Sequence, residues 1–323
     1  MKLINVTRQF ATEDACLNYL ERMRWPNGVC CIGCGSLKVQ RLKLNIRPTG
    51  KANPRSSKRA TLRAKSRRVY QCLERECLHQ FTATSGTVFH KTHLPLNVWF
   101  MAIAMICEAK KGMSANQLKR HLGVNYRTAW FLVHRIREAM IELSPKPLSG
   151  DVEFDETYLG GKKRKQGYLR NKRMILGAVQ RGGQLRLRFE DRAKQPSQQI
   201  AREWVAATIA PDTQRLLTDA HPAYFGLGQG KHKHESVNHI AFEWVRGDVH
   251  TNTIENVWSL LKRAVIGTYH KVSIKHLQRY LEEFTYRFNR RGQQPEMFAE
   301  TVQELLRRIQ LPYKKLTAEA EVV

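Results

Sequence analysis

The sequence predicts an α/β protein in which a small cysteine-bearing module and a set of helices precede a domain of strands and helices. Three observations predict this order. Cysteines occur in two closely spaced pairs early in the chain, and a stretch with helical periodicity, interrupted by glycines, follows them. From residue 152 onward, short β-rich segments alternate with tight turns and helical patterns. We therefore expect domains over residues 1–90, 91–143 and 150–312, with residues 143–150 (LSPKPLSG) as a linker.

The chain is strongly basic. Its 323 residues include 55 Lys and Arg against 28 Asp and Glu, which gives a formal net charge of +27. Such an excess is typical of a protein that meets a polyanion over a large surface, so nucleic acid is the expected partner, of an enzyme or of a ribosomal-type structural binder. The 42% of hydrophobic residues favour packed cores. No apolar run approaches the roughly 20 residues of a membrane span and no signal-peptide pattern opens the chain, so we expect a soluble intracellular protein without a membrane partner.

Paired cysteines indicate a metal site. Cys31 and Cys34 have the C-x2-C spacing of a zinc knuckle, and Cys72 and Cys77 form a second pair with C-x4-C spacing. The odd total of seven cysteines, in a chain without an export signal, disfavours a disulfide framework. We expect the two pairs to bind one structural Zn²⁺, and the alternative is a set of buried apolar thiols. Four other residues bear on this site: Cys30 and His79 as possible substitute ligands, and Cys16 and Cys107 as packing residues in apolar helical patterns.

A basic stretch separates the two cysteine pairs. Residues 41–68 contain eleven Lys and Arg and no acid, and their prolines and glycine argue against a continuous helix. We expect a long loop that grips phosphates without reading sequence, although a merely solvated charge run is the alternative. The expected phosphate contacts are Arg55, Lys58, Arg59, Arg63, Lys65, Arg67 and Arg68.

The next segment predicts three helices, broken near Gly112 and Gly123. The last two have a helix-turn-helix outline, and the final helix has an apolar stripe of Ala129, Leu132, Val133 and Ile136. In a helix-turn-helix, the amino-terminal end of the second helix faces the major groove. Asn125, Tyr126 and Arg127 are therefore the expected DNA contacts, although a plain helical bundle would give the same pattern.

The α/β domain begins with three segments that read as hairpin-linked strands: residues 152–161, 173–183 and 184–192, the last two joined at Gly182-Gly183. Residues 197–209 then predict a helix, residues 213–220 a fourth strand and residues 252–265 a further helix. Three hairpin-linked strands followed by a helix and a fourth strand is the order of an RNase H-like fold.

The acids strengthen this prediction. Asp155 lies in the first strand, with Glu153 on the same face and Glu156 on the opposite one; Asp219 closes the fourth strand, and Glu255 lies in the first turn of the later helix. An RNase H-like sheet would bring Asp155, Asp219 and Glu255 to one edge. In a strongly basic protein we expect such carboxylates to bind two Mg²⁺ or Mn²⁺ ions, which would assist an in-line displacement at phosphorus.

Glu255 also has a structural explanation, because Asn252 as N-cap and Glu255 three residues later are close to a capping box. Lys262 lies seven residues after Glu255, about 20° away on the same helical face, where it suits a contact with a DNA phosphate. The two roles of Glu255 are compatible. His232, His234 and His239, in the preceding segment KHKHESVNHI, are expected to be solvated or to face DNA.

Four segments closely resemble the bacterial insertion-sequence transposases of the ISXO-type group, which join a zinc ribbon to a DDE/RNase H-like catalytic domain: VEFDETYLGG, TDAHPAY, VRGDVHTNTIENVWSLLKR and YLEEFTYRFNRR. The resemblance covers nearly the whole chain. It implies that Asp155, Asp219 and Glu255 are the metal-binding triad and that Lys262 is the accompanying base. Since some members of the group use Asn as the third residue, Asn252 and Asn256 rank as alternatives below Glu255.

By this resemblance the expected activity is DNA transposition, with cleavage at the terminal inverted repeats and attack of the freed 3'-hydroxyl on target DNA. The zinc ribbon and helix-turn-helix would recognise double-stranded DNA ends, and a homo-oligomer would act on them in the bacterial cytoplasm, nucleoid-associated when bound. Two other functions stay open. A non-catalytic DNA-binding regulator derived from a transposase would have a broken triad, and an RNase H-like nuclease would not need an end-specific helix-turn-helix.

Overall fold

The computed structural model describes residues 1–42, 68–160, 172–191, 195–228, 232–309 and 311–318. The chain divides into two compact units. Unit 1 consists of Met1–Glu108, Ala115–Ala139 and Gln294–Val323, and unit 2 consists of Ala109–Ser114 and Met140–Gln293. Among the described helices, none is both long enough and apolar enough to cross a membrane.

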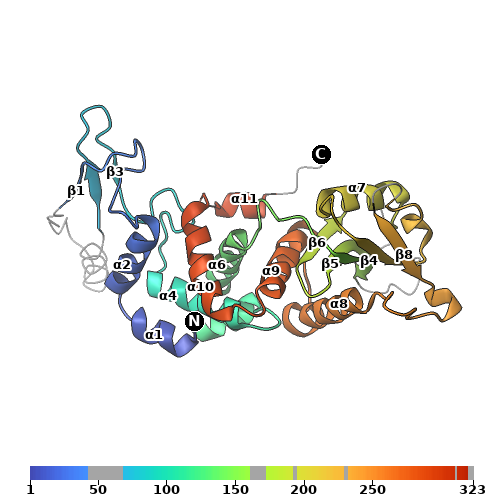
Figure 1. Cartoon of the computed structure of the whole chain (residues 1–323). Helices are drawn as coiled ribbons and strands as arrows, with labels where there is room; N and C mark the ends of the chain where they lie inside the picture. Colours follow the sequence, from blue (N-terminus) through green and yellow to red (C-terminus); the bar gives the residue numbers. More distant parts are fainter. Residues whose placement is uncertain (43–67, 161–171, 192–194, 229–231, 310, 319–323) are drawn as a thin grey trace. The chain divides into compact units, whose positions relative to one another are not determined.

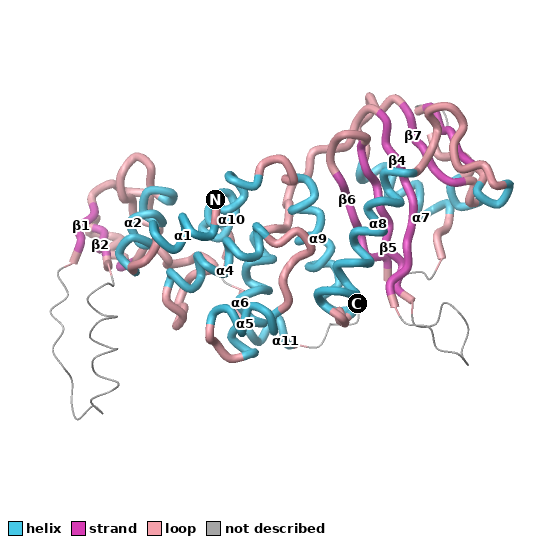
Figure 2. The backbone as a smooth tube through the Cα atoms, turned by 90° about the horizontal axis from the view of Figure 1, so that it is seen from below, coloured by secondary structure: helices cyan, strands magenta, loops and turns pink. Residues whose placement is uncertain are grey.

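The amino-terminal part of unit 1 contains two helices and a small three-stranded antiparallel sheet (Figure 2). Its elements are α1 (Leu3–Gln9), α2 (Glu13–Arg24), β1 (Val39–Arg41), β2 (Tyr70–Cys72) and β3 (Gln80–Phe81). Helix α2 begins at Thr12, whose hydroxyl accepts a hydrogen bond from the amide of Ala15. Trp25, directly after α2, packs edge-on against Tyr70 and Phe81, so the end of the helix is fixed to the sheet.

The described part of unit 1 has five further helices: α4 (Leu96–Glu108), α5 (Ala115–Leu122), α6 (Tyr126–Ala139), α10 (Gln294–Arg307) and α11 (Tyr313–Thr317). Helices α4, α5 and α6 are the three that the sequence predicts, and Gly112 and Gly123 between them adopt positive φ angles. The predicted stripe of α6 is buried: Ala129, Leu132, Val133 and Ile136.

Helix α10 lies in unit 1, although the sequence places residues up to 312 in the α/β domain. Phe298 of α10 packs with Phe10, Tyr19 and Phe100 in an aromatic cluster, which joins α10 to the amino-terminal helices. The carboxyl-terminal helices therefore complete the core of the amino-terminal part of the chain.

Unit 2 is built on a five-stranded sheet (Figure 1). Its strands are β4 (Asp151–Leu159), β5 (Arg173–Gln180), β6 (Leu185–Glu190), β7 (Arg215–Asp219) and β8 (Lys233–Val237). They lie in the order β6-β5-β4-β7-β8, with β5 antiparallel to both β6 and β4, β7 parallel to β4, and β8 parallel to β7. Helix α7 (Gln198–Thr208) follows β6 and precedes β7. This is the order of strands and helix that the sequence predicts for an RNase H-like domain.

Helices cover both faces of the sheet (Figure 1). On one face, Ala201 and Val205 of α7 pack in a core with Phe154 of β4. On the other face, α8 (Asn252–Ala264) and α9 (Leu277–Asn289) contribute Ile254 and Leu281 to a second core. Because strand residues alternate between the faces, Glu153 and Asp155 point toward α8 and Glu156 toward the face of α7, as predicted.

Candidate active site and zinc site

The sulfur atoms of Cys31, Cys34, Cys72 and Cys77 gather in unit 1, where all four lie within 4.8 Å of one another. The sulfurs of Cys31 and Cys77 are 3.6 Å apart, and so are those of Cys34 and Cys72. Zinc held tetrahedrally by Zn–S bonds of about 2.3 Å places its sulfurs roughly 3.8 Å apart. The cluster therefore fits one structural zinc ion and matches the predicted ligand set.

Glycines shape the first cysteine pair. The amide of Gly33 donates to the Cys31 sulfur at 3.4 Å, and Gly35, with a φ of +76°, donates its amide to the Cys31 carbonyl at 2.9 Å. Four residues stand apart from the set of ligands: Cys30, His79, and the buried Cys16 and Cys107 within α2 and α4. Burial raises the pKa of Cys16 to about 12, which suits a packing thiol.

Asp155 lies within β4 beneath α8. Its Oδ2 accepts a hydrogen bond from the Trp258 Nε1–H at 2.7 Å. Opposite Asp155 on β5 is Gly177, and a Cβ atom at that position would lie only 2.4 Å from the Trp258 ring. A glycine is thus what allows the indole to approach the strand, and the indole in turn orients the carboxylate.

Two carboxylates of β4, Asp155 and Glu156, are affected by Asp219 of β7. Asp219 ends β7, and its Oδ1 accepts a hydrogen bond from the amide of His221 at 3.1 Å. Burial, followed by the negative charges of Glu156 and Asp219, raises the pKa of Asp155 well above its ordinary range. Burial and the charge of Asp219 also raise the pKa of Glu156, against the hydrogen bond that Glu156 accepts from Tyr224. A bound cation would offset the repulsion among these like charges.

Glu255 lies in the first turn of α8, three residues before Trp258, so the two are neighbours on the helix surface. Its Oε1 accepts a hydrogen bond from the Thr251 hydroxyl at 2.9 Å and lies 3.8 Å from His239 Nε2. Lys262 is further along the same helix and exposed. Within the described ranges, no three carboxylates have oxygens within 4.8 Å of one another, so the predicted triad is gathered less closely than the four thiols.

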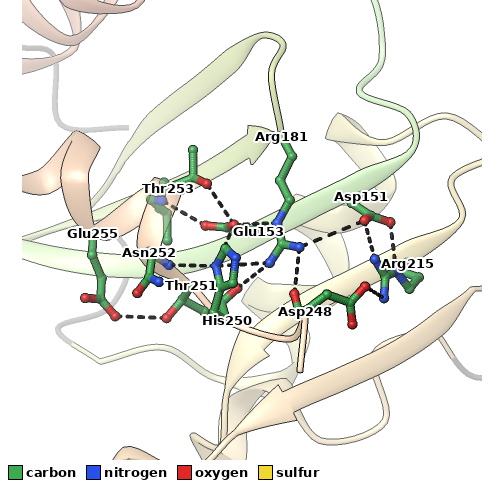
Figure 3. Close-up of polar contacts among 11 residues, drawn as sticks. Asp151, Glu153, Arg181, Arg215, Asp248, His250, Thr251, Asn252, Thr253 and Glu255 are labelled. Atoms are coloured by element: carbon green, nitrogen blue, oxygen red, sulfur yellow. Dashed lines mark hydrogen bonds and ion pairs between the residues drawn. The ribbon is translucent and has the colours of Figure 1, made fainter. Parts of the chain in front are cut away.

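The start of α8 is held by Glu153, a buried carboxylate that sequence reasoning placed on the right face but gave no role (Figure 3). Its Oε2 accepts from the Ile254 amide at 2.9 Å, and its Oε1 accepts from the Thr253 hydroxyl at 2.9 Å and from Arg181 Nε at 2.8 Å. A carboxylate at a helix amino terminus satisfies free amides and complements the helix dipole. Glu153 therefore fastens α8 to β4.

This arrangement corrects the expected capping box. The N-cap is Thr251, and Asn252 is the first helical residue; neither side chain caps an amide of α8. The cap comes instead from Glu153, about a hundred residues earlier in the chain, which no local sequence pattern could reveal.

Two arginines attach the segment before α8 to the sheet (Figure 3). Arg181 donates to the backbone oxygens of Asp248, at 2.8 Å, and His250, at 2.9 Å. Arg215 of β7 pairs with Asp151 of β4 and, at 2.7 Å, with Asp248. The hydrogen bonds from Arg215 lower the pKa of both aspartates, so the network stays charged at neutral pH.

Comparison with known proteins identifies the family. Residues 147–289 match the ISXO2-like transposase domain, and residues 11–80 match the transposase zinc-ribbon domain. The two matches together span well over half of the chain and include both clusters of predicted site residues. The chain belongs to the ISXO2-like transposase family. A relative of this transposase, 28% identical over 303 residues (87% of this chain and 92% of its own length), is an uncharacterized protein in transposable element ISH50 of Halobacterium salinarum.

Among solved structures, the transposase matches a chain in the cryo-EM structure of the simian T-cell lymphotropic virus intasome in complex with PP2A regulatory subunit B56 gamma. The identity is 13% and the TM-score 0.30, over 52% of this chain and 63% of that chain.

The basic residues predicted to grip phosphates are only partly described in the transposase. Six lie outside the described residues: Arg55, Lys58, Arg59, Arg63, Lys65 and Arg67. Arg68 is described, and it pairs with Glu21 at 2.8 Å and with Asp14 at 3.2 Å. Both acids belong to α2, so Arg68 ties the β2 side of the ribbon to this helix.

The residues at the start of α6 differ in their surroundings. Asn125 is an N-cap, since its Oδ1 accepts a hydrogen bond from the Thr128 amide at 2.8 Å. Tyr126 is 48% exposed, and the Arg127 guanidinium lies 4.3 Å from the centre of the Tyr313 ring. Tyr126 is thus the freest of the three to meet another molecule.

Two of the three histidines expected to be solvated or to face DNA make contacts within unit 2. His234 lies in β8, and its Nε2 is 2.9 Å from the Thr218 hydroxyl; His232 Nδ1 is 3.0 Å from the Thr213 carbonyl oxygen. The sequence does not predict β8, so it also misses these contacts with β7 and its flank. His239 alone of the three lies next to a predicted catalytic residue, Glu255.

Proposed function

We propose that this chain is a DDE transposase, which binds the terminal inverted repeats of its insertion sequence, cleaves DNA at the element ends and transfers the 3'-hydroxyl ends to target DNA. Family membership supports the class of reaction. One observation supports the site: the negative charge of Asp219, on the neighbouring parallel strand, contributes to the raised pKa of Asp155, and Trp258 of the helix that carries Glu255 donates a hydrogen bond to Asp155.

Asp155, Asp219 and Glu255 would hold Mg²⁺ or Mn²⁺, two ions per site, because hard divalent cations prefer carboxylate oxygens. The raised pKa of Asp155 supports this fit, since a divalent cation would offset the repulsion among the carboxylates. Bound there, such ions lower the pKa of the attacking water or hydroxyl and stabilise the leaving oxygen of a phosphodiester.

The chain's own residues position this chemistry. Trp258 donates a hydrogen bond to Oδ2 of Asp155 and so orients the carboxylate. Glu153 fixes the first turn of α8 and so keeps Glu255 at the same side of the sheet as Asp155. Lys262, exposed further along α8, would bind a phosphate of the DNA strand as a point charge.

Recognition of the ends would belong to unit 1. Helices α5 and α6 would act as a helix-turn-helix with Tyr126 and Arg127 toward the major groove, and the zinc ribbon and its basic stretch would bind flanking phosphates. The two ends of an element would be brought together by a homo-oligomer on DNA. This assignment rests on the exposure of Tyr126 and on the net charge of +27.

The test uses the full chain, Mg²⁺ and a duplex taken from the DNA that flanks the coding sequence and carries the inverted repeat. The wild type should cut the duplex at the element end. Asp219→Asn should bind the duplex equally well and leave it intact, whereas Asp212→Asn, which changes an exposed carboxylate just before β7, should cut normally. Equal cleavage by Asp219→Asn would overturn the metal assignment.

Two other results would favour other functions. Specific binding by the wild type without cleavage in Mg²⁺ or Mn²⁺ would favour a non-catalytic regulator. Metal-dependent cleavage without preference for the inverted repeat would favour an RNase H-like nuclease.

A further inference from the structure

The segment between β8 and α8 carries a group of exposed apolar side chains beside the acidic site. We infer that residues 238–246, the apolar loop, receive a DNA base that has left the base stack at the element end. The inference rests on the proposed function, because it takes the DNA end to be bound at Asp155, Asp219 and Glu255.

The apolar loop exposes more hydrophobic surface than folding alone would leave. Ile240 is 91% exposed, Phe242 82%, Trp244 56% and Val245 50%. Single exposed apolar residues are common on protein surfaces, but four large ones within six positions are a patch, and such patches mark binding sites.

The loop is built to hold these side chains outward. The Asn238 side chain accepts hydrogen bonds from the amides of Ile240, at 3.1 Å, and Ala241, at 3.2 Å. Glu243 bonds Asn238 twice, through its amide and through its carboxylate. Arg246 donates to the Ser236 carbonyl at 3.0 Å, which closes the base of the loop. The apolar surface is therefore preformed.

Phe242 has the most unusual backbone in the loop. Its φ is +59°, a left-handed conformation that is unfavourable for a bulky side chain. The ring is 82% exposed, so packing within unit 2 offsets little of this cost. Strain that local packing does not offset is typical of residues held for a ligand.

The apolar loop is next to the third predicted acid. The His239 ring lies against Trp244, with ring centroids 4.7 Å apart, and His239 Nε2 is 3.8 Å from Glu255 Oε1. A strand end bound at Glu255 would therefore reach the apolar side chains within the length of a nucleotide.

A DNA base fits this surface better than a second copy of the chain does. Two aromatic side chains offer about 150–250 Å² each when fully covered, so the loop falls well short of the roughly 800 Å² that each partner buries in a standard protein interface. A base offers a flat π-face that stacks on Phe and Trp in any sequence, and aliphatic side chains such as Ile wedge between base steps. A phosphodiester at a duplex end is also easier to reach when its base is unpaired.

The experiment uses duplex ends with 2-aminopurine at the terminal positions of the inverted repeat, first with EDTA and then with Mg²⁺. Wild-type binding should raise the 2-aminopurine fluorescence, because the base leaves the neighbouring DNA bases that quench it. Phe242→Ala should bind with unchanged affinity, show no rise, and cleave paired ends about tenfold more slowly, which is the effect of losing one base–aromatic stack. Phe242→Trp should restore both signals, and Leu143→Ala, which truncates a side chain 74% exposed in unit 2, should behave as wild type.

Ends with a mismatch at the cleavage position separate the outcomes. Phe242→Ala should cleave them at the wild-type rate, because the base is already free. If Phe242→Ala shows the same fluorescence rise and the same cleavage rate as the wild type, the inference is overturned. If Phe242→Ala sediments differently from the wild type in the absence of DNA, the loop is instead a contact between copies of the chain. If the wild type raises fluorescence in EDTA but never cuts DNA, the proposed function fails while the loop assignment stands.

Discussion

The Glu153 carboxylate accepts a hydrogen bond from the backbone amide of Ile254 at 2.9 Å, across a hundred residues of sequence. The side chain of Glu153 is fully buried, and Arg181 supplies the compensating charge at 2.8 Å. The contact joins the strand that carries Asp155 to the helix that carries Glu255. It therefore fixes the positions of these two members of the proposed catalytic triad relative to one another.

Glu153→Gln should weaken the attachment of α8 to β4. The amide keeps one acceptor but loses the charge that pairs with Arg181, so we expect the free energy of unfolding of unit 2 to fall by roughly 3 kcal/mol. Cleavage should fall while DNA binding by unit 1 stays unchanged. Thr253→Val is the matched control, because it removes one hydroxyl bond to the same carboxylate and should cost about 1 kcal/mol. Thermal melting and cleavage assays of the two variants measure both effects, and equal loss from both would argue against a charged clamp.

Asp155→Asn should stabilise the metal-free protein at neutral pH. The folded-state pKa of Asp155 is raised, so wild-type stability decreases as pH rises from the ordinary carboxyl value, about 4, through that raised pKa. The asparagine does not ionise and avoids this cost. In EDTA the variant should melt above the wild type at pH 7.5, and the gap should close toward about pH 4.

Mg²⁺ should reverse the order, because it stabilises the wild-type carboxylates and finds a weaker site in Asp155→Asn. Scanning calorimetry with and without Mg²⁺ checks both statements. If the melting temperature of the wild type changes with neither pH nor Mg²⁺, the carboxylates do not interact with one another or with the metal ion.

Gly177→Ala should reduce cleavage although it changes none of the acidic residues. The new methyl group would collide with the Trp258 ring, so the indole must move away from Asp155. We expect a loss of about 1–3 kcal/mol in stability and a matching loss of cleavage. Gly267→Ala is the control, since Gly267 has nothing within 4 Å of its added methyl group and has an ordinary φ. If Gly177→Ala cleaves as well as Gly267→Ala does, Trp258 is not needed to orient Asp155.

The four-cysteine site predicts the zinc content of the protein. Purified protein should contain about one zinc per chain, and Cys34→Ser should lose it together with the fold of the ribbon. Cys30→Ser, which changes a neighbouring cysteine outside the set of four, should keep its zinc. Elemental analysis gives the stoichiometry, and DNA-end binding should follow the zinc content of each variant.

Sequence patterns predicted the elements that depend on local periodicity. The alternation along β4 placed Glu153 and Asp155 on one face, and the turn at Gly182-Gly183 followed from local chemistry, whereas Asn252 was wrongly expected to cap α8. The role of Glu153 could not be predicted, because its partner Ile254 becomes a neighbour only when α8 packs on the sheet.

Other features depend in the same way on contacts between distant segments. The partner of Gly177 is an indole from α8, and β8 has a polar composition that gives no strand signal until it pairs with β7. The prediction of the triad residues, by contrast, uses their positions in a strand or helix, which is local information that the cap and the ion pairs around them do not offer.

Unit 1 is assembled from segments near both ends of the chain, so its folding depends on the order in which the chain is synthesised. Phe298, from the last tenth of the chain, completes an aromatic cluster whose other members come from the first hundred residues. A nascent chain therefore cannot finish its amino-terminal core until the ribosome has also made the whole of unit 2. Prematurely terminated polypeptides would lack a stable unit 1, the part proposed to recognise DNA, so they should compete poorly with the complete protein for the ends of the element.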